Sequence, residues 1–209
     1  MKNKLISTAI RQFGERGFDG ASTRDIASEA GTTMSNITYH FKGKEGLYRA
    51  AAEAIVQRFA EVSRHQFSQP VPPDIDAATR IERVCAVLRT IGAFMLSDEA
   101  EPLARFVARE QQSSQSVMRE YFQRDIAPMV DALKQHVTIL RPDLSAEDVN
   151  ATVFFLLSMA ISLRSSRMSL CMFMEVTDID DRLGAQVLER LEATVREVLA
   201  HPVSKEGQR

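Results

Sequence analysis

The chain has 209 residues, of which 44% are hydrophobic and 26% charged, and its formal net charge at pH 7 is −2. This is the ordinary composition of a soluble globular protein that can bury a hydrophobic core. Nine Gly and seven Pro are few for this length, whereas helix-forming residues are plentiful, so we expect an all-α protein. Cys85 and Cys171 show no paired or metal-ligand spacing, so neither a disulfide framework nor a zinc site is indicated, and both are expected to be buried thiols.

Neither a secretion signal nor a membrane span is expected. Lys2 and Lys4 lie near the start, but Arg11 interrupts the apolar stretch that a signal peptide would need. The most apolar segment, residues 149–163, contains several polar side chains and stops at Arg164, short of a bilayer span. The sequence therefore predicts a cytoplasmic protein without a membrane partner.

The charge is unevenly distributed along the chain. Residues 1–68 hold ten Lys and Arg against seven Asp and Glu, and the remaining residues hold sixteen against twenty-one. A basic end on an acidic body is typical of a nucleic-acid-binding segment joined to a regulatory body. A solvated surface gives such an excess by chance quite often, so the asymmetry carries weight only together with a motif in the same segment.

The first two predicted helices are bounded by residues suited to helix ends. Apolar side chains in residues 5–13 recur at steps of three and four, which places them on one stripe of a helix that ends at Gly17. Ser22 and Asp25 have the spacing of a capping box and open a short second helix that ends at Gly31.

A third short helix is expected over residues 34–41. Thr32 or Thr33 can cap it, and Ile37 and Phe41 lie four apart and face the core. The opposite face carries Thr33, Met34, Ser35, Asn36, Thr38, Tyr39 and His40. A helix of about two turns that exposes small polar side chains suits insertion into the major groove of DNA.

A dense run of residues between positions 5 and 50 carries a resemblance to a known family. It consists of Ala9, Phe13, Gly17-Phe18, Ser22-Thr23-Arg24-Asp25-Ile26-Ala27, Ala30-Gly31, Ile37-Thr38-Tyr39-His40-Phe41 and Lys44-Glu45-Gly46-Leu47-Tyr48. On these residues the chain resembles the DNA-binding domain of TetR-family regulators, and it is most similar to members with a CerR-type C-terminal domain. It departs from the family pattern at Thr32, where Val is usual, and at Thr38, where many members have Tyr.

The resemblance implies a role in DNA binding for each of these polar residues. The family's phosphate-holding positions carry Thr23, Tyr39, His40 and Lys44. The positions that approach base edges carry Arg24, Met34, Ser35 and Thr38. Arg24 is the one long forked donor and is expected to contact guanine. The predicted DNA-binding set is Thr23, Arg24, Thr33, Met34, Ser35, Asn36, Thr38, Tyr39, His40 and Lys44.

The rest of the chain is predicted to be a helical body. A long amphipathic helix over residues 44–67 precedes a proline-rich loop at 69–74 that reverses the chain. Further helices are expected from near Asp76 to near Ser97, from Glu101, over residues 117–140 with a kink or a break just before Pro128, from Ser145 to about Met174, and from Leu183 to Leu199. We therefore predict a helix-turn-helix DNA-binding domain over residues 1–48 and an effector-binding and dimerisation domain over residues 49–209.

The last two predicted helices carry more apolar surface than a lone monomer is expected to cover. In TetR-family regulators the final two helices pair with their copies in a four-helix dimer interface, so the resemblance implies a homodimer. A two-fold dimer reads two related half-sites, and the expected operator is an inverted repeat in double-stranded DNA.

A small-molecule effector is expected to bind the body. Seven methionines between positions 95 and 174 suit a pocket that closes around apolar ligands, although they can equally fill gaps in the core. Arg105 and Arg109 share one helix face, and Arg164 and Arg167 flank the apolar segment. Either pair can neutralise an acidic ligand or form ion pairs with nearby glutamates. The effector-site candidates are Arg105, Phe106, Arg109, Phe155 and Met159.

The sequence thus predicts a repressor that an effector releases from its operator, with no cofactor, metal or catalytic residue. The sequence does not support the alternative that the chain is an enzyme, because it has no Gly-rich phosphate loop, no HExxH motif and no nucleophile elbow. A DNA-binding architectural protein without an effector is the other alternative. A tight inverted-repeat site that a metabolite releases would favour the regulator, and uniform DNA coating that no ligand alters would favour the architectural protein.

Overall fold

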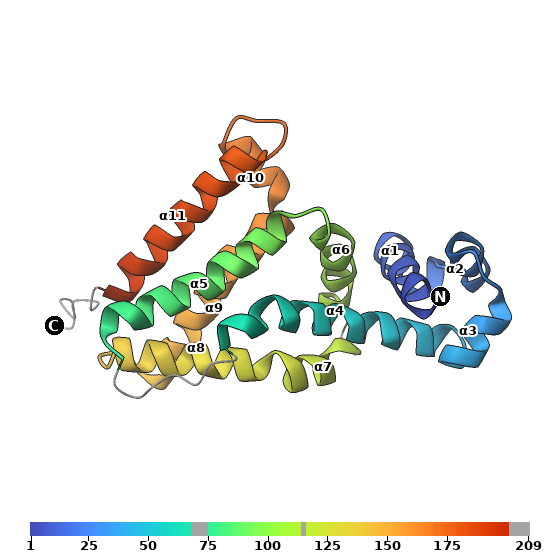
Figure 1. Cartoon of the computed structure of the whole chain (residues 1–209), viewed down its shortest axis with the longest axis horizontal. Coiled ribbons are helices and arrows are strands. Elements are labelled where there is room, and N and C mark those ends of the chain that lie inside the picture. Colours follow the sequence, from blue (N-terminus) through green and yellow to red (C-terminus); the bar gives the residue numbers. More distant parts are fainter. Residues whose placement is uncertain (68–74, 114–115, 201–209) are drawn as a thin grey trace. The chain divides into compact units, whose positions relative to one another are not determined.

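The computed structural model describes residues 1–67, 75–113 and 116–200, and all secondary structure in these ranges is helical (Figure 1). The helices are α1 (Lys2–Gly20), α2 (Thr23–Ala30), α3 (Met34–Phe41), α4 (Lys44–Phe67), α5 (Ala77–Leu96), α6 (Ala100–Gln111), α7 (Met118–Asp125), α8 (Ala127–Leu140), α9 (Ala146–Ser165), α10 (Arg167–Phe173) and α11 (Asp181–Ala200). The predicted all-α fold class is confirmed. The proline-rich loop expected at 69–74 lies outside the described residues.

The chain forms two compact units that each combine two segments. Unit 1 contains Met1–Glu61 and Ser97–Ala127, and unit 2 contains Val62–Leu96 and the chain from Pro128 onward. Unit 1 therefore includes α6 and α7 besides the N-terminal helices, whereas the sequence divides the chain at residue 48.

Unit 1 has an aromatic core where α1, α4 and α6 meet. The rings of Phe13 and Phe106 are each 1% exposed. Tyr48 lies against both, with ring centroids 4.9 Å from Phe13 and 4.8 Å from Phe106. The Tyr48 hydroxyl donates to the Glu110 carboxylate at 2.5 Å, and burial and this carboxylate raise the pKa of Tyr48. The segment that follows α5 is thus an integral part of the fold around α1.

The residues that the sequence places at helix ends in unit 1 lie at or near those ends, but not all of them cap or end a helix as expected. Gly17 adopts a φ of 75° and breaks the regular helix inside α1, and Ser22 caps α2 by accepting from the backbone N–H of Asp25. Gly31 ends α2 with a φ of 71°. Thr33 occupies the N-cap position of α3 without a side-chain cap hydrogen bond.

Unit 2 is built around α5, which packs against α9 and α11. A Cβ at Gly92 would lie 2.8 Å from Leu188 and 3.2 Å from Leu163, so α5 approaches both neighbouring helices closely at this point. Arg164 donates to the carbonyls of Met95 and Leu96 at 2.8 and 2.9 Å, and it thereby satisfies the C-terminal end of α5.

Three expectations for unit 2 need correction. The helix that was expected to reach Met174 stops at Ser165, because Ser166 is non-helical with φ −119° and ψ 28°. The apolar segment expected to be too short for a membrane span lies in α9, which begins at Ala146 and has 20 residues. By length and composition α9 could span a membrane, but core helices of soluble proteins pass the same test. Cys171 is half-buried rather than buried. The break before Pro128, by contrast, is confirmed.

Candidate nucleic-acid interface

The third helix of unit 1 has one buried side and one open side. Ile37 and Phe41 are buried against the unit, as their spacing predicts. The opposite side is exposed at Thr33, Met34, Ser35, Thr38, Tyr39 and His40. This helix is a short rod whose polar side is open to solvent, the arrangement that a helix needs to enter a major groove.

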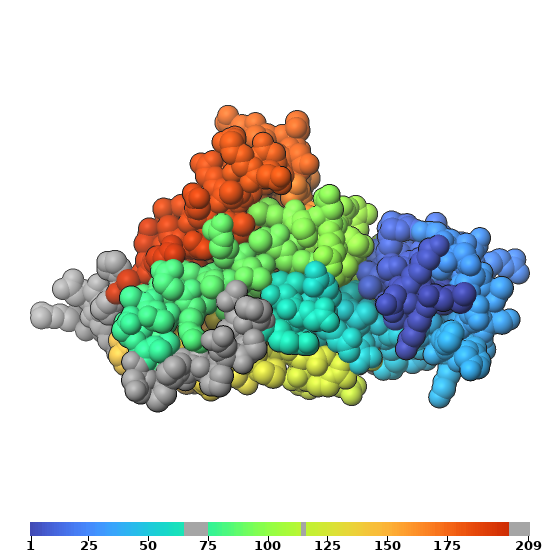
Figure 2. All heavy atoms as spheres, viewed as in Figure 1, coloured from blue at the N-terminus to red at the C-terminus, as the bar shows by residue number. Residues whose placement is uncertain are grey.

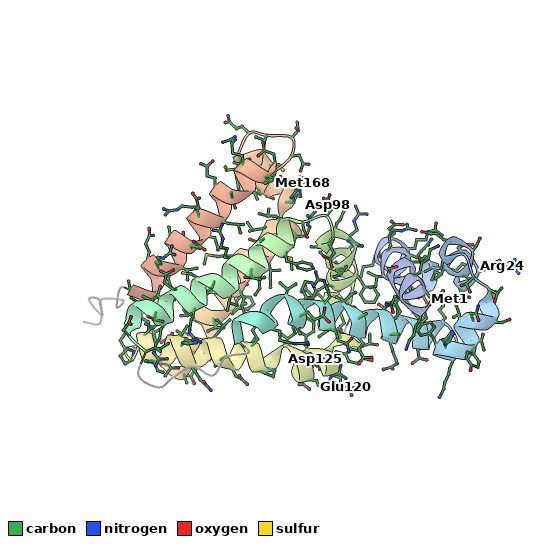
Figure 3. All side chains as sticks on the ribbon, in the orientation of Figure 1. Met1, Arg24, Asp98, Glu120, Asp125 and Met168 are labelled. Atoms are coloured by element: carbon green, nitrogen blue, oxygen red, sulfur yellow. The ribbon has the colours of Figure 1, made fainter. Side chains whose placement is uncertain are left out.

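Arg24 lies at the start of α2 with a free side chain. Its side chain is exposed, makes no hydrogen bond or ion pair to the described part of the chain, and points away from α1 (Figure 3). Ser22 caps the N–H of Asp25, whereas the N–H groups of the half-buried Thr23 and of Arg24 have no partner within the helix. The start of α2 thus offers backbone donors to an anion and a guanidinium to a base edge.

Lys44 has a fixed position at the start of α4. Its ammonium donates to the carbonyl of Asp19 at 3.2 Å and lies 4.8 Å from the centre of the Phe18 ring. The charge is therefore held beside the free N–H groups of the first turn of α4, where a phosphate is favoured.

Asn36 and Thr38 make hydrogen bonds inside the motif. The Asn36 amide donates to the Thr32 hydroxyl at 2.6 Å, which links α3 to the turn that precedes it. The Thr38 hydroxyl donates to the Met34 carbonyl at 3.3 Å. Both side chains contribute to the local structure, and Asn36 is half-buried. Ser35, by contrast, makes no side-chain hydrogen bond to the described residues.

Three further lysines lie around α3 that the sequence pattern does not assign to DNA binding. Lys42 closes α3 in the left-handed conformation, with φ 60°, and is exposed. The Lys2 ammonium lies 6.0 Å from the centre of the Phe41 ring, and that of Lys4 lies beside Gly31. Lys2 and Lys4 reach this surface only through the packing of α1, so the basic balance of residues 1–68 is their one sequence signal.

The close approach of α3 to α4 depends on a glycine. A Cβ at Gly46 would lie 1.7 Å from the carbonyl oxygen of Phe41. Any side chain at this position would therefore displace the end of α3 from the first turn of α4.

The effector-site candidates on α6 all make contacts inside unit 1. Phe106 belongs to the aromatic core. Arg109 donates to the carbonyls of Gly14 and Glu15, at 2.7 Å each, so its guanidinium stabilises the contact between α6 and α1. Arg105 is paired with Glu101 at 2.5 Å.

The other two candidates belong to unit 2. Phe155 is exposed and Met159 half-buried on α9. Of the two arginines flanking this segment, Arg164 holds the end of α5, and Arg167 pairs with Asp178 at 2.5 Å. Binding of an effector by the five candidates remains a prediction.

Two family models match the chain. Residues 5–51 match the model for bacterial regulatory proteins of the tetR family. Residues 80–202 match the C-terminal domain of the HTH-type transcriptional dual regulator CecR. This domain type, under the name CecR rather than CerR, is the one indicated by the sequence resemblance.

Curated relatives are regulators of the same kind. The HTH-type transcriptional dual regulator CecR of Shigella flexneri is 34% identical over 158 residues, which cover 72% of this chain and 67% of that protein. The probable HTH-type transcriptional regulator YttP of Bacillus subtilis (strain 168) is 30% identical over 119 residues, covering 57% and 54%.

Solved structures share the fold over nearly the whole chain. AibR in complex with isovaleryl coenzyme A and operator DNA has a TM-score of 0.68 at 18% identity, covering 97% of this chain and 99% of that one. FadR from Bacillus subtilis in complex with stearoyl-CoA has a TM-score of 0.64 at 16% identity, covering 97% and 100%. Identities this low show likeness of fold alone.

Proposed function

Because the chain belongs to the TetR family of bacterial regulators and has a CecR-type C-terminal domain, we propose that it represses transcription from an inverted-repeat operator and that a small-molecule effector releases it. The observation that carries the proposal is the open polar side of α3, where Ser35, Tyr39 and His40 are exposed and make no hydrogen bond to the described chain. Selection of bound sites from random duplex DNA tests it: an enriched inverted repeat is expected, and binding without sequence preference would contradict it.

In this proposal some residues of the interface bind the DNA phosphates and others contact the base edges. Tyr39, His40 and Lys44 contact phosphates, which fixes the position of α3 on the duplex but carries no sequence information. Arg24 reaches a guanine edge through its forked donors. The exposed lysines around α3 add phosphate attraction and make the affinity salt-dependent.

Arg24→Ala is expected to reduce discrimination between the operator and unrelated DNA by about 1–3 kcal/mol. Lys44→Ala is expected to weaken binding to all sequences alike and to lower the slope of log K against log salt by about 1. Fluorescence anisotropy with operator and scrambled duplexes at several salt concentrations measures both effects.

The control for these variants is Lys134→Ala, which removes a half-buried cation of unit 2 that pairs with Asp131. It should leave both the discrimination and the salt slope unchanged. Because Lys44 also holds the end of α1, the unfolding of Lys44→Ala must be measured alongside. Equal losses of specific and non-specific binding for Arg24→Ala would refute its assignment to a base.

We further propose that the outer face of α9 and the adjoining α10 pack against a second copy of the chain. Phe154 and Phe155 are 65% and 64% exposed on α9. Met168, Met172 and Phe173 are exposed on α10. The surface of α10 is orange in Figure 2, and Met168 is labelled in Figure 3. Apolar surface of this extent is typical of an interface.

Phe154→Glu is expected to shift the protein from dimer to monomer, because a carboxylate would be buried in an apolar interface. Analytical ultracentrifugation measures the change. Ile139→Glu is the matched control, since Ile139 is a similarly exposed apolar residue of α8. Dimers of equal strength for both variants would place the interface elsewhere.

The proposed effector acts without chemistry, by changing the spacing of the two reading helices in the dimer. A coupling of about 1–3 kcal/mol between effector and operator suffices for a switch. Isovaleryl and stearoyl coenzyme A are suitable first probes, since both occur in structures with this fold. Release of the selected operator by a small molecule is the expected result; an operator complex that no metabolite in a broad panel weakens would favour the architectural alternative.

A further inference from the structure

Asn36 lies on the open side of α3, but its side chain is held in place. It is half-buried, whereas Thr33 one turn before it and Tyr39 and His40 one turn after it are exposed. A side chain at such a position can reach a base edge when the helix enters a major groove. Which base it reads depends on the hydrogen-bonding atoms that remain available.

The donor nitrogen of Asn36 is engaged inside unit 1. Nδ2 donates to the hydroxyl oxygen of Thr32 at 2.6 Å and to Sδ of Met1, a weak acceptor, at 3.6 Å. The Thr32 hydroxyl in turn donates to Sδ of Met1 at 3.5 Å. Because the hydroxyl hydrogen of Thr32 is directed to the sulfur, its oxygen faces Asn36 as an acceptor, and this fixes the orientation of the amide.

The amide oxygen of Asn36 is the atom that remains available to DNA. Oδ1 has no hydrogen-bond partner among the described residues, and it is not buried. An asparagine with a free amide offers a donor and an acceptor side by side and pairs with both N6–H and N7 of adenine. Asn36 offers an acceptor alone, which matches the N4–H donor of cytosine. Opposite adenine it would leave N7 without a donor, and an unpaired polar group is costly.

We propose that Thr32 restricts Asn36 to accepting a hydrogen bond, and that Asn36 thereby selects cytosine over adenine at one position of each operator half-site. The inference rests on the proposed function and specifies which base this part of the interface reads. Asn36 makes the contact with the base edge, and Thr32 is a positioning residue that acts through the Asn36 amide.

Selection of bound sites from random duplex DNA by the full-length protein and two variants tests the proposal. Asn36→Ala is expected to abolish the base preference at one position of each half-site and to keep the preferences at the others. The wild type is expected to enrich cytosine at that position. Thr32→Val has nearly the same shape but no hydroxyl, so it frees the amide donor of Asn36, and adenine is expected to be enriched there at the expense of cytosine.

Fluorescence anisotropy with two operator duplexes, carrying cytosine or adenine at this position, measures the size of the effect. The wild type is expected to bind the cytosine duplex about tenfold more tightly, and Thr32→Val is expected to lose this advantage. Thr32→Ser keeps the hydroxyl and should retain the wild-type ratio. Thr194→Val is the matched control, because it removes a hydroxyl of unit 2 that donates to the Arg190 carbonyl at 3.0 Å, and it should leave the ratio unchanged.

A purely structural role of Thr32 has a different outcome. Thr32→Val would then weaken binding to both duplexes by the same factor, and this result would overturn the proposal. Selection of adenine by the wild type at the position that depends on Asn36, or no change at any position in Asn36→Ala, would also overturn it. An inverted repeat that the wild type and both variants enrich alike refutes this inference alone, whereas the absence of any enriched site refutes the proposed function.

Discussion

Replacing Phe106 by alanine is expected to lower the free energy of unfolding by about 3–5 kcal/mol. The ring is 1% exposed, and its centroid lies 4.8 Å from that of Tyr48 and 6.5 Å from that of Phe13. Its removal leaves a cavity among α1, α4 and α6 that rigid neighbours cannot fill completely. Urea unfolding at fixed protein concentration measures the loss.

Tyr39→Ala is the matched control for this substitution. Tyr39 is an aromatic residue of the same unit, but it is 82% exposed, so its removal should change the free energy of unfolding by no more than about 0.5 kcal/mol. Near-normal unfolding of Phe106→Ala, together with loss of effector binding, would instead give Phe106 the ligand-binding role that its sequence context suggests.

A second large effect is expected for Gly46→Ala, which should destabilise the protein by at least about 3 kcal/mol, the upper end of the usual cost of overpacking. The added Cβ would overlap the carbonyl oxygen of Phe41 at 1.7 Å, and a backbone atom cannot move aside as a flexible side chain can. Because α3 would be displaced, operator affinity should fall as well. Urea unfolding and fluorescence anisotropy measure the two effects.

Gly20→Ala provides the comparison, since a Cβ there would only touch Cβ of Arg16 at 3.4 Å. This variant should retain both its stability and its operator affinity, because alanine is a better helix former than glycine. If Gly46→Ala proved equally stable, α3 and α4 would have to separate more easily than the structure indicates.

The sequence predicts the elements whose limits are set by local chemistry. The helix over residues 44–67 is confirmed at both ends, because Gly43 with positive φ precedes it and a proline-rich sequence follows it. The end at Gly31 is confirmed, since this residue adopts positive φ, whereas Gly17 with positive φ only interrupts α1, which continues to Gly20. The amphipathic spacing of Ile37 and Phe41 also predicts which side of α3 is open.

Features set by tertiary contacts cannot be predicted from local sequence patterns. The interruption at Ser166 contains neither Gly nor Pro and lies beside the Arg167–Asp178 ion pair, which joins residues eleven positions apart. The hydrogen bond from Arg109 to Gly14 spans 95 positions, so a helical pattern alone cannot assign α6 to the N-terminal unit. Lys2 likewise reaches the surface of α3 only because α1 packs there.

The composition of unit 1 from two chain segments limits how its specificity can be transplanted. A chimaera that joins residues 1–61 to the body of another regulator would lack Phe106 and Arg109, and with them the ring and the guanidinium that hold α1. The exchangeable module is residues 1–61 together with 97–127, so a functional graft needs three splice points rather than one.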